Sequence, residues 1–494
     1  SQSLHYTDGL GVPCYNGNIS SMTWKSGAGA TPRGYKFSYD RLGRLTDAEY
    51  GEGPSLSVNT NRFNEQVTGY DKMGNILGLK RYGQTSATGY DVIDDLSLSY
   101  AGNRLKKVAD RSGTSTFNNG FEFKDGIDLS TEYEYDENGN LTKDLNKNIT
   151  AIQYNCLNLP SRVMFANGNS ISYLYDAAGR KLRTVHVLEG DSVTTDYCGN
   201  VVYENGVPQI LLTEVGYVSL TDGKYHYYLK DHQGNNRVVV DEEGTVEEVN
   251  DYYAFGGLMS TSSRQSVQPY KYNGKELDRK GGLDWYDYGA RMYDAALGRF
   301  MKTDRFSEKY VSLSPYQYGA NNPVNNIDVN GDSIWYTRNG DIVTMYVTAK
   351  IFNNSSDNIN MARAAKDIVS DIKSTYEGKF EWSDNKTYNL KVDMDLKVAT
   401  SMKDVENSDH LFVLADSDSK GARGATSMLG GKVMTLASSD FANNNWLSNN
   451  LSYNKTFTAT HEFGHAIGLS HSQNPFNIMR SEERRVGKEC RSRW

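Results

Sequence analysis

The sequence predicts a mainly β fold, an array of stacked hairpins, followed by a smaller α+β domain. Three observations lead to this prediction: a short motif that recurs through the first two thirds of the chain, a composition rich in Tyr and Gly, and a change of pattern after Gly331. The chain has 494 residues, too many for one core, and we expect roughly two to four domains. Its 35 Tyr and 46 Gly beside 9 Pro are typical of short strands joined by tight turns.

The recurring motif reads Tyr-Asp-x-x-Gly-[Arg/Asn]-[Leu/Ile]. We predict that each copy is a hairpin in which Tyr ends a strand, Asp accepts backbone hydrogen bonds, Gly supplies a positive φ, and Leu or Ile begins the next strand facing inward. A single hairpin cannot bury its apolar face, so neighbouring copies must stack. We interpret the tyrosines as packing residues, with carbohydrate stacking as the alternative. Clear copies begin at Tyr39, Tyr70, Tyr135 and Tyr175, and weaker ones at Tyr100 and Tyr154.

These copies resemble the YD repeats of the RHS proteins. The resemblance is sharpest in residues 225–240, 251–259, 270–306 and 314–332, which look like the RHS-associated core that closes such arrays. It implies that the repeats coil into a hollow β shell, and that the chain beyond the core is a variable effector, often a toxin, held inside. Without the resemblance, the residues indicate only stacked β hairpins.

Some members of that family cut themselves after the core, using aspartates in two DPxG-like segments. The matching places here read TDRF and IDVNGD, so Asp304 and Asp328 align with those aspartates while both prolines are absent. Self-cleavage is one interpretation of Asp304 and Asp328, and a role in turns or caps is the other.

The repeat pattern stops after Gly331, and an α+β domain is predicted beyond it. Residues 333–352 alternate apolar and polar residues around an Asn-Gly pair, which predicts a β hairpin. Strands are expected in 388–400, 410–416 and 430–439, and a last helix from about Thr456. Between them, an amphipathic helix capped by Ser356 or Asp357 is indicated by apolar residues at helical spacing: Met361, Ala365, Ile368, Val369, Ile372 and Tyr376.

The last predicted helix carries the string HEFGHAIGLSH. On a helix His461 and His465 project from one face, close enough for two imidazoles to bind one Zn²⁺. Gly468 can end the helix, so that His471 returns as a third ligand. Glu462 is rotated by about a quarter turn and faces the open fourth position, where it can take a proton from water whose pKa is lowered toward ~7. Polar residues on a surface helix are the alternative interpretation.

The full H-E-x-x-H-x-x-G-x-x-H string resembles the metzincin zinc peptidases, and its spacing to Met479 is nearest to the matrixin-like branch. The resemblance implies that Met479 forms the turn beneath the metal, that Zn²⁺ is the cofactor, and that peptide bonds are hydrolysed with Glu462 as general base. We expect the substrate to lie along an edge strand, with 430–439 as the candidate. The lone His410 is interpreted as structural.

Charge and composition argue against several classes of protein. A net charge of -8 argues against a nucleic-acid-binding surface, because phosphate contacts require clustered Lys and Arg. Apolar runs are too short for a membrane span. The four cysteines stand far apart and are predicted to be free thiols. A chain beginning at Ser1 suggests a fragment, and residues 481–494 resemble a translated sequencing adapter, with a basic targeting tail as the literal alternative.

The predicted organisation has four parts: a YD-repeat array over 1–224, an RHS-associated core over 225–331, a metzincin-like domain over 332–480 and a foreign tail over 481–494. We expect a fragment of a secreted or cell-surface bacterial toxin that is delivered to target cells, acts on a protein or peptide, and has a cognate immunity protein. One alternative is a cell-surface protein whose repeats bind carbohydrate or a partner, with an inactive metal-binding domain. Another is a structural shell around inactive cargo.

Overall fold

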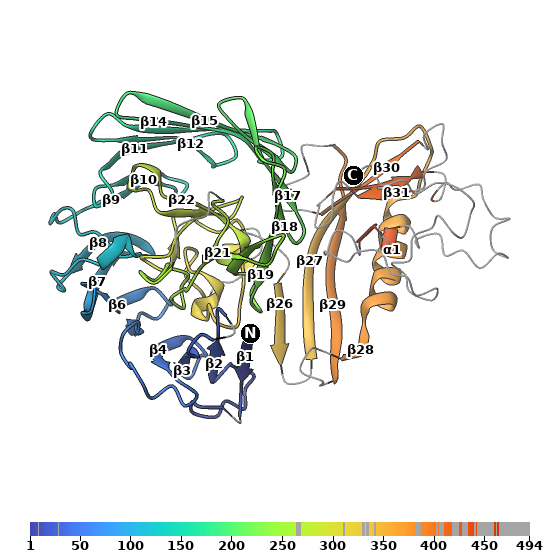
Figure 1. Cartoon of the computed structure of the whole chain (residues 1–494). Helices are drawn as coiled ribbons and strands as arrows, with labels where there is room; N and C mark the ends of the chain where they lie inside the picture. The colour runs from blue at the N-terminus through green and yellow to red at the C-terminus, as the bar shows by residue number, and fades with distance from the viewer. Residues whose placement is uncertain are drawn as a thin grey trace. The chain divides into compact units, whose positions relative to one another are not determined.

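The computed structural model divides into two compact units, Ser1–Asp332 and Ser333–Trp494 (Figure 1). The residues that the structure describes are 1–262 apart from 8 and 28, 268–309, 312–328, 331, 335–339, 342–381, 387–401, 404, 410–416, 424–426, 433–438, 441, 459–460 and 462–463.

Two long antiparallel sheets make up most of the first unit, and in each sheet every strand pairs with its neighbours in chain order. The first has eight strands: β1 (Gln2–His5), β2 (Ser21–Trp24), β3 (Arg33–Tyr39), β4 (Leu45–Glu52), β5 (Glu65–Tyr70), β6 (Ile76–Gln84), β7 (Tyr90–Ala101) and β8 (Arg104–Asp110). The second has thirteen: β9 (Tyr133–Tyr135), β10 (Leu141–Asp144), β11 (Ile149–Tyr154), β12 (Pro160–Phe165), β13 (Ser170–Tyr175), β14 (Lys181–Leu188), β15 (Asp191–Cys198), β16 (Val201–Glu204), β17 (Val207–Thr213), β18 (Gly216–Ser219), β19 (Tyr225–Lys230), β20 (Asn236–Asp241) and β21 (Val246–Val249).

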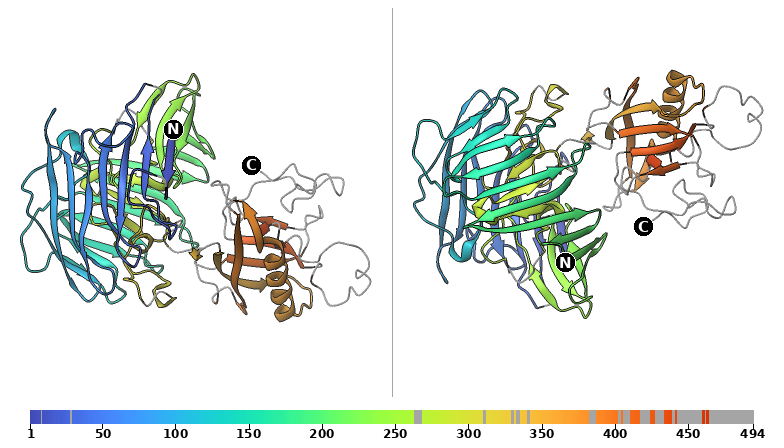
Figure 2. Two further views of the ribbon diagram at one scale, coloured as in Figure 1. Left: turned by 90° about the horizontal axis from the view of Figure 1, so that it is seen from below. Right: turned by 90° about the horizontal axis from the view of Figure 1, so that it is seen from above.

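The segment after β21 fills the inside of this unit. In Figures 1 and 2 the two sheets curve around it. Its aromatic residues Trp285, Tyr286 and Tyr293 are 2% exposed or less, and they share one apolar core with residues of both sheets, such as Phe37 and Leu141. It contains β22 (Glu276–Asp278), β23 (Trp285–Asp287), β24 (Met292–Asp294) and β25 (Arg299–Phe300), with short 3-10 helices at Tyr272–Gly274, Lys280–Gly282, Ser307–Lys309 and Gly319–Asn321; another, Phe117–Asn119, follows β8.

The repeat turn is built around its aspartate. Between β5 and β6, Asp71 Oδ1 accepts hydrogen bonds from the backbone N–H groups of Met73 and Asn75 at 2.9 and 2.8 Å, and Oδ2 accepts one from Asn75 Nδ2 at 2.7 Å. Gly74 has a φ of 86°, which glycine adopts without strain. Ile76 then begins β6 and is buried. The predicted turn is confirmed in this copy.

Four more turns share this arrangement. In each, the aspartate Oδ1 accepts the backbone N–H four residues on, and Oδ2 accepts a side-chain donor from the same residue, which is Arg or Asn. The Arg or Asn after Gly in the motif therefore has a structural role in these turns, because its side-chain N–H donates to the second carboxylate oxygen. The four aspartates are Asp40, Asp136, Asp176 and Asp231.

The tyrosine of one copy reaches back to the copy before it. The hydroxyl groups of Tyr70 and Tyr100 donate hydrogen bonds to the backbone carbonyls of Leu45 and Ile76, each at 2.6 Å. Each acceptor is the first residue of the strand that follows the preceding turn. The tyrosines therefore pack against the core, as predicted, and also bond neighbouring copies together. Tyr154 makes the same bond to Leu141, the first residue of β10, at 2.6 Å, and Tyr39 donates to the carbonyl of Ile19, two residues before β2, at 2.8 Å.

The copy at Tyr175 departs from the prediction. Its glycine is followed by Arg-Lys-Leu, so Leu182 comes one place later than in the other copies. Because side chains alternate across a strand, Leu182 faces outward and is 38% exposed. Lys181 takes the inward place, and its Nζ lies 2.6 Å from carboxylate oxygens of both Glu276 and Asp287. The prediction of an inward leucine is wrong for this copy.

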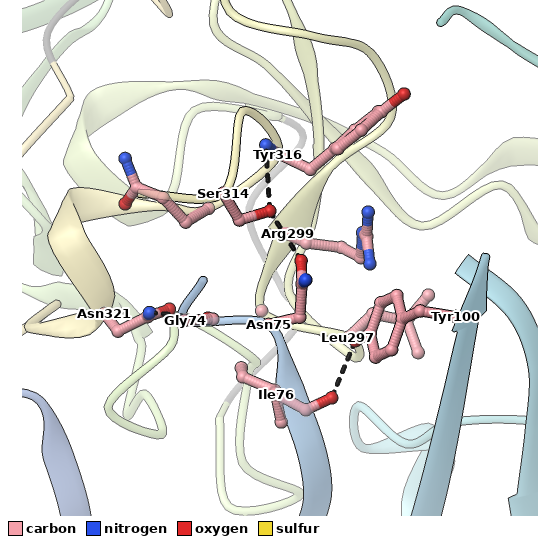
Figure 3. Close-up of a pocket in the computed structure, with 11 residues that line it drawn as sticks. Gly74, Asn75, Ile76, Tyr100, Leu297, Arg299, Ser314, Tyr316 and Asn321 are labelled. Carbon is pink, nitrogen blue, oxygen red and sulfur yellow. Dashed lines mark hydrogen bonds between the residues drawn. The ribbon is translucent and has the colours of Figure 1, made fainter. Parts of the chain in front are cut away.

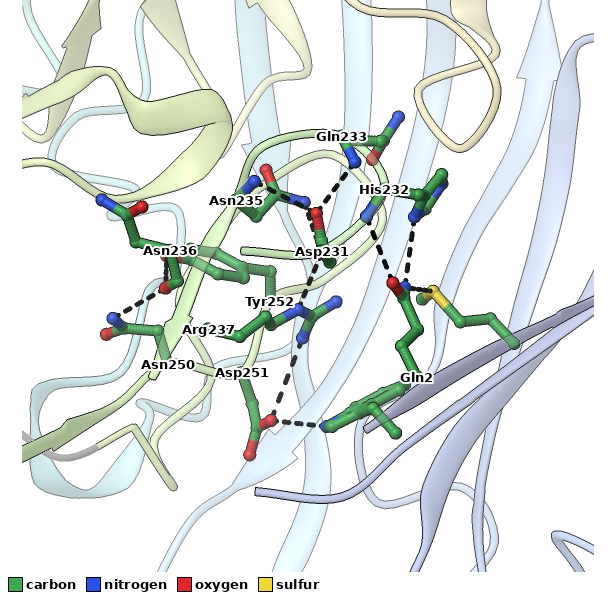
Figure 4. A network of polar contacts seen from close by, with 12 residues as sticks. Gln2, Asp231, His232, Gln233, Asn235, Asn236, Arg237, Asn250, Asp251 and Tyr252 are labelled. Atoms are coloured by element: carbon green, nitrogen blue, oxygen red, sulfur yellow. Dashed lines mark hydrogen bonds and ion pairs between the residues drawn. The ribbon is translucent and has the colours of Figure 1, made fainter. Parts of the chain in front are cut away.

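Polar contacts tie the first strand to the turn between β19 and β20 (Figure 4). Gln2 Nε2 lies 3.1 Å from His232 Nδ1, and Gln2 Oε1 accepts the His232 N–H at 3.1 Å. Nearby, Trp24 Nε1 donates to Asp251 Oδ1 at 2.6 Å. Residues more than 200 positions apart in the chain are thereby held together.

One mixed sheet of seven strands forms the centre of the second unit, in the order β28-β29-β27-β30-β32-β31 with β26 also beside β27. β27 is parallel to β29 and β30, and β30 is parallel to β32, whereas β26, β28 and β31 are antiparallel to their partners. The predicted hairpin at Asn-Gly is confirmed by the pairing of Asn339 with Ile342. The bounds are β26 (Trp335–Asn339), β27 (Ile342–Asn353), β28 (Gly378–Glu381), β29 (Thr387–Val398), β30 (His410–Ala415), β31 (Gly424–Thr426) and β32 (Val433–Ala437).

The amphipathic helix α1 spans Met361–Tyr376, as predicted, and buries Ile368 and Ile372 in the core of this unit. Its N-cap is Asn360, whose Oδ1 accepts the Arg363 N–H at 3.0 Å. The predicted caps are wrong because both are bonded elsewhere: Ser356 donates to Asp416, and Asp357 accepts from Ser438.

The predicted fold class, a mainly β chain with an α+β end, is confirmed. In the described part of the chain, no helix is long and apolar enough to cross a membrane. Cys14, Cys156 and Cys198 are free thiols, as predicted, and Cys490 lies outside the described residues.

Candidate active site

Four residues of the predicted peptidase helix are described, and all four are buried. Ala459, Thr460, Glu462 and Phe463 have helical geometry, in agreement with a helix beginning near Thr456. Their exposed fractions are 0, 1, 5 and 0%. A helix lying on the surface would leave polar residues such as Thr460 and Glu462 in water. Burial of both contradicts the surface-helix alternative for these residues.

Aromatic contacts hold this helix against α1 and β30. The Tyr376 hydroxyl, in the last turn of α1, donates to the Thr460 carbonyl at 3.0 Å. The Phe463 ring lies 5.8 Å from that of Tyr376, nearly edge to face, and 6.4 Å from the imidazole of His410. Burial raises the pKa of the Tyr376 phenol, which therefore stays protonated as a donor. His410 thus packs beside the helix at the start of β30.

Glu462 is the predicted general base, and its burial bears on that role. Placing a carboxylate in a protein interior is costly unless hydrogen bonds, a cation or a metal holds its charge. Glu462 is 5% exposed, and Ala459 and Phe463 of the same helix are fully buried. Such a glutamate is typical of a functional site rather than of a solvent-facing surface.

The predicted zinc ligands His461, His465 and His471 and the Met-turn residue Met479 lie outside the described residues. Their convergence on one Zn²⁺ stays a prediction. Within the described part of the chain, no group of three or more His, Cys, Asp and Glu residues is arranged to hold a metal ion.

The strand at the edge of the second unit's sheet is not the one predicted. The strand in 430–439, β32, pairs with β30 on one side and with β31 on the other, so its backbone groups are already bonded. The prediction that 430–439 is the free edge is wrong. The outer strand at this side of the described sheet is β31, which runs antiparallel to β32. Sequence pattern alone does not reveal this, because β31 is three residues long.

The two aspartates considered for self-cleavage are brought together in the first unit. Arg291 Nη2 lies 2.9 Å from Oδ2 of Asp304 and 2.9 Å from Oδ2 of Asp328. The same guanidinium donates through Nε to the Gly331 carbonyl at 2.8 Å. Both carboxylates are buried, with exposed fractions of 6 and 3%. Two aspartates 24 positions apart in the chain thus share one arginine.

Burial governs the ionisation of this cluster. It raises the pKa of Asp328; the charge of Arg291 opposes this rise, and that of Asp304 adds to it. Asp328 Oδ1 has no hydrogen-bond partner among the described residues. Close by, burial and the charges of two arginines lower the pKa of Lys302 to about 7, and its Nζ donates to the Asn158 carbonyl at 2.8 Å.

Arg291 and Lys302 were missed by sequence reasoning. Neither stands at a spacing from the two aspartates that indicates a shared site, because the contact arises from chain folding over tens of residues. The one available signal was that both basic residues lie in a segment rich in aromatic residues, where a charge needs a partner.

A known family matches each of the two units. A family model of the teneurin YD-shell matches residues 15–324, and a model of matrixin matches residues 341–489. The chain belongs to the teneurin YD-shell family. The resemblance of the repeats to YD repeats is thereby confirmed, and so is the resemblance of the last domain to matrixins.

Curated relatives of this YD-shell protein differ in what they do. Salivary gland surface protein 1 of Aedes aegypti is 31% identical over 250 residues, which are 45% of this chain and 7% of the relative. The tRNA3(Ser)-specific nuclease WapA of Bacillus spizizenii is 25% identical over 319 residues, 62% of this chain and 11% of the relative. The tRNA nuclease WapA of Bacillus subtilis is 26% identical over 269 residues. The YD-shell chain therefore spans about a tenth or less of the first two relatives' lengths.

Two solved structures align with the YD-shell chain. The crystal structure of TcdB2-TccC3-TEV covers 63% of this chain and 18% of its own, with a TM-score of 0.43 and 16% identity. A Tc holotoxin pore from Photorhabdus luminescens covers 67% of this chain and 20% of its own, with a TM-score of 0.34 and 16% identity. Both likenesses are too low to support an argument about function.

Proposed function

We propose that this YD-shell chain is part of an RHS-type toxin whose C-terminal domain is a zinc-dependent endopeptidase. The observation that carries the proposal is the H-E-x-x-H-x-x-G-x-x-H string within the region matched by matrixin, on a helix whose described residues are buried. A YD shell followed by a matrixin domain supports a toxin carrying a protease effector.

The donor set of this segment fits zinc. Three neutral imidazoles, from His461, His465 and His471, are the ligands that catalytic zinc sites commonly use. A zinc ion held there would act as a Lewis acid and lower the pKa of water. The described residues of this helix are anchored by Tyr376 and Phe463, and a helix that continued through His461 and His465 would present both imidazoles in a fixed direction.

Glu462 would move the proton. Its carboxylate takes a proton from the attacking water and delivers it to the amine that leaves the broken peptide bond. Burial suits both steps, because it limits the access of bulk water to the carboxylate. The fixed helix keeps it at one position through both transfers.

The substrate would bind as an extra strand beside β31. An extended peptide that pairs with an antiparallel outer strand gains main-chain hydrogen bonds at every second residue. β31 is the outer strand on this side of the described sheet, and Met434 and Leu436 of its partner β32 share one core with α1 and Phe463. The net charge of -8 supports a protein substrate rather than a nucleic acid.

The test compares zinc content and peptide cleavage. Zinc is measured by mass spectrometry on the purified full chain, and cleavage on casein and a peptide library. We expect about one zinc per chain, and at least a 100-fold loss of cleavage in Glu462→Gln with zinc retained. The matched control is Asp395→Asn, an exposed carboxylate of the same unit that pairs with Lys397. If the wild type binds zinc but cleaves neither casein nor the peptides, the peptidase proposal is wrong.

The boundaries and cellular setting are proposed with the function. The division after Asp332 supports a boundary there. With it we propose an effector domain over 332–480, a repeat array over 1–224 and a core over 225–331. Residues 481–494 are proposed to be foreign to the domain. A toxin of this design would be secreted or displayed by a bacterium, delivered to a target cell, and neutralised by an immunity protein in the producer.

A second candidate function is a cell-surface binding protein with an inactive last domain. The name of the mosquito relative, a salivary gland surface protein, favours it. In that case the repeats would bind carbohydrate or a partner protein. Binding of a glycan array by the full chain, with no cleavage of casein or peptides by zinc-loaded protein, would favour this alternative.

We also propose self-cleavage after the core, because one guanidinium, that of Arg291, contacts both Asp304 and Asp328 and so brings the two aspartates to one place. Intact-mass measurement of the purified wild type is expected to show two fragments, and Asp304→Asn or Asp328→Asn a single chain. Asp176→Asn, at a repeat turn, is the control. A single intact mass for the wild type excludes the proposal.

A further inference from the structure

Four arginines are buried among the described residues of this chain, and three of them pair with carboxylates. Arg81 contacts Glu65 and Asp94, Arg291 contacts two aspartates, and Arg237 contacts Asp231. A buried guanidinium without such a partner is costly, because its hydration is lost and not replaced.

Arg299 in β25 is the exception. It is 5% exposed, and it makes no ion pair with a carboxylate of the described residues. Its Nη2 donates to the Asn103 carbonyl at 3.0 Å, and its Nε has no hydrogen-bond partner among the described residues. The rings of Tyr100 and Tyr316 lie 5.2 and 4.8 Å from its guanidinium carbon. These aromatic faces attract the cation but do not neutralise it.

Arg299 lines a recess that contains no acidic side chain. The recess is small, with a cavity volume of about 10 Å³, and is lined by eleven residues, of which Arg299 is the one that carries a charge. Its polar neighbours include Asn75 and Ser314 (Figure 3). Gln317 lines the recess as well. Ser314 Oγ donates to Asn75 Oδ1 at 2.5 Å.

The nearest repeat aspartates do not supply the missing charge. Asp71 is held by Met73 and Asn75 through its own turn, and Asp136 is held by Asn140 in the same way. Their carboxylates are therefore occupied by turn formation and cannot move to Arg299 without breaking a hairpin.

We propose that this recess binds a small inorganic anion, which pairs with the Nε side of Arg299. The site joins three parts of the first unit: the turn before β6, the strand β7 that carries Tyr100, and the closing segment that carries Arg299 and Tyr316. An anion bound there stabilises the contact between the repeat sheet and the segment inside it. Because it binds the folded form, it shifts the folding equilibrium by mass action.

The test is thermal unfolding of the full chain in sodium chloride, sodium phosphate and sodium gluconate at matched ionic strength. Gluconate serves as the bulky anion. At a concentration of about 100 times Kd, the binding anion is expected to raise the folded-to-unfolded ratio of the first unit about 100-fold, and gluconate is not. Equal stabilisation by all three salts would overturn the proposal.

Two variants and one control identify the site. Gln317→Glu places a carboxylate beside Arg299, with which Gln317 forms a β-bridge, while keeping the oxygen that accepts the Ala320 N–H. It is expected to raise the melting temperature at low salt and to abolish the anion response. Arg299→Gln is expected to lose the response as well. Arg180→Gln, an exposed arginine of a repeat turn, should retain it.

A direct measurement covers the case in which Arg299→Gln does not fold. Crystals of the wild-type chain grown in sodium bromide are expected to show an anomalous peak at about hydrogen-bond distance from Arg299 Nε. Absence of that peak, or an unchanged anion response in Gln317→Glu, would show that the recess holds water alone.

Discussion

The hydroxyl of Tyr70 donates a hydrogen bond to the carbonyl of Leu45 at 2.6 Å, so the tyrosine of one repeat holds the backbone of the repeat before it. Tyr100, Tyr39 and Tyr154 make the same bond. The Tyr-Asp pair therefore has two separable tasks. Asp closes its own turn, and Tyr joins that turn to its predecessor.

Tyr70→Phe is predicted to lower the free energy of unfolding by about 1 kcal/mol, because the Leu45 carbonyl loses its donor while the ring stays packed. Tyr175→Phe is the matched control, since the Tyr175 hydroxyl has no partner among the described residues. Both are measured by urea unfolding at one temperature. Equal losses in the two variants would mean that the hydroxyl bond contributes nothing.

Lys181→Met is predicted to destabilise the first unit by about 1–3 kcal/mol at neutral pH, because Glu276 and Asp287 are left as partly buried charges without their cation. Burial alone would raise the pKa of Asp287, but Lys181 and the Gly289 N–H lower it overall.

The pH dependence of this loss follows from the lowered pKa. The stability that Asp287 contributes is present above its unfolded pKa and is lost as pH falls through the folded value. The difference between wild type and Lys181→Met should therefore shrink toward acid pH in urea titrations. Arg183→Met, which removes an exposed pair with Asp196, is the control and should change little. A difference independent of pH would contradict the prediction.

Asp144→Asn is predicted to stabilise the first unit near pH 7.5 but not near pH 4. Burial raises the pKa of Asp144 to about 7, with Lys147 opposing and Asp294 adding to the rise. Between about pH 4 and 7 the unfolded chain releases a proton that the folded chain keeps, so stability falls as pH rises.

The measurement for Asp144 is urea unfolding of wild type and variant across that pH range. Other buried carboxyls act on both proteins alike, so the difference between the two profiles reports Asp144. Parallel profiles would show that its proton is not involved.

Removing the metal is predicted to affect the two units differently. If Zn²⁺ binds the folded second unit, EDTA should lower the melting temperature of that unit and leave the transition of the first unit unchanged. Scanning calorimetry of the full chain separates the transitions, and added zinc should restore the original profile. A shift in the first transition alone would place the metal elsewhere.

The repeat turns and the helix α1 could be predicted because their determinants are local. Asp71, Gly74 and Ile76 act within six positions, and the apolar stripe from Met361 to Tyr376 has one period throughout. The Asn360 cap was missed because the competing side chains Ser356 and Asp357 bond to residues distant in sequence.

The candidate sites depend on contacts that no local pattern contains. Arg291 contacts Asp304 and Asp328 only when the closing segment is folded. The burial of Arg299 against the Asn103 carbonyl depends on the same folded segment. Lys181 shows how a single added residue changes a strand: it moved a leucine outward and a charge inward. The helical geometry of Ala459, Thr460, Glu462 and Phe463 could be predicted because its pattern is local.

The bonds of Tyr70, Tyr100 and Tyr154 each have a main-chain oxygen of the preceding copy as acceptor, and Tyr39 donates to a main-chain oxygen that also lies earlier in the chain. Because a protein is synthesised from its N-terminus, the acceptor of each bond is made before the tyrosine that donates to it. Since any residue type offers the same carbonyl, gene duplication or deletion of a copy leaves the joint intact. Such an array can lengthen or shorten in evolution without matching changes at a second position.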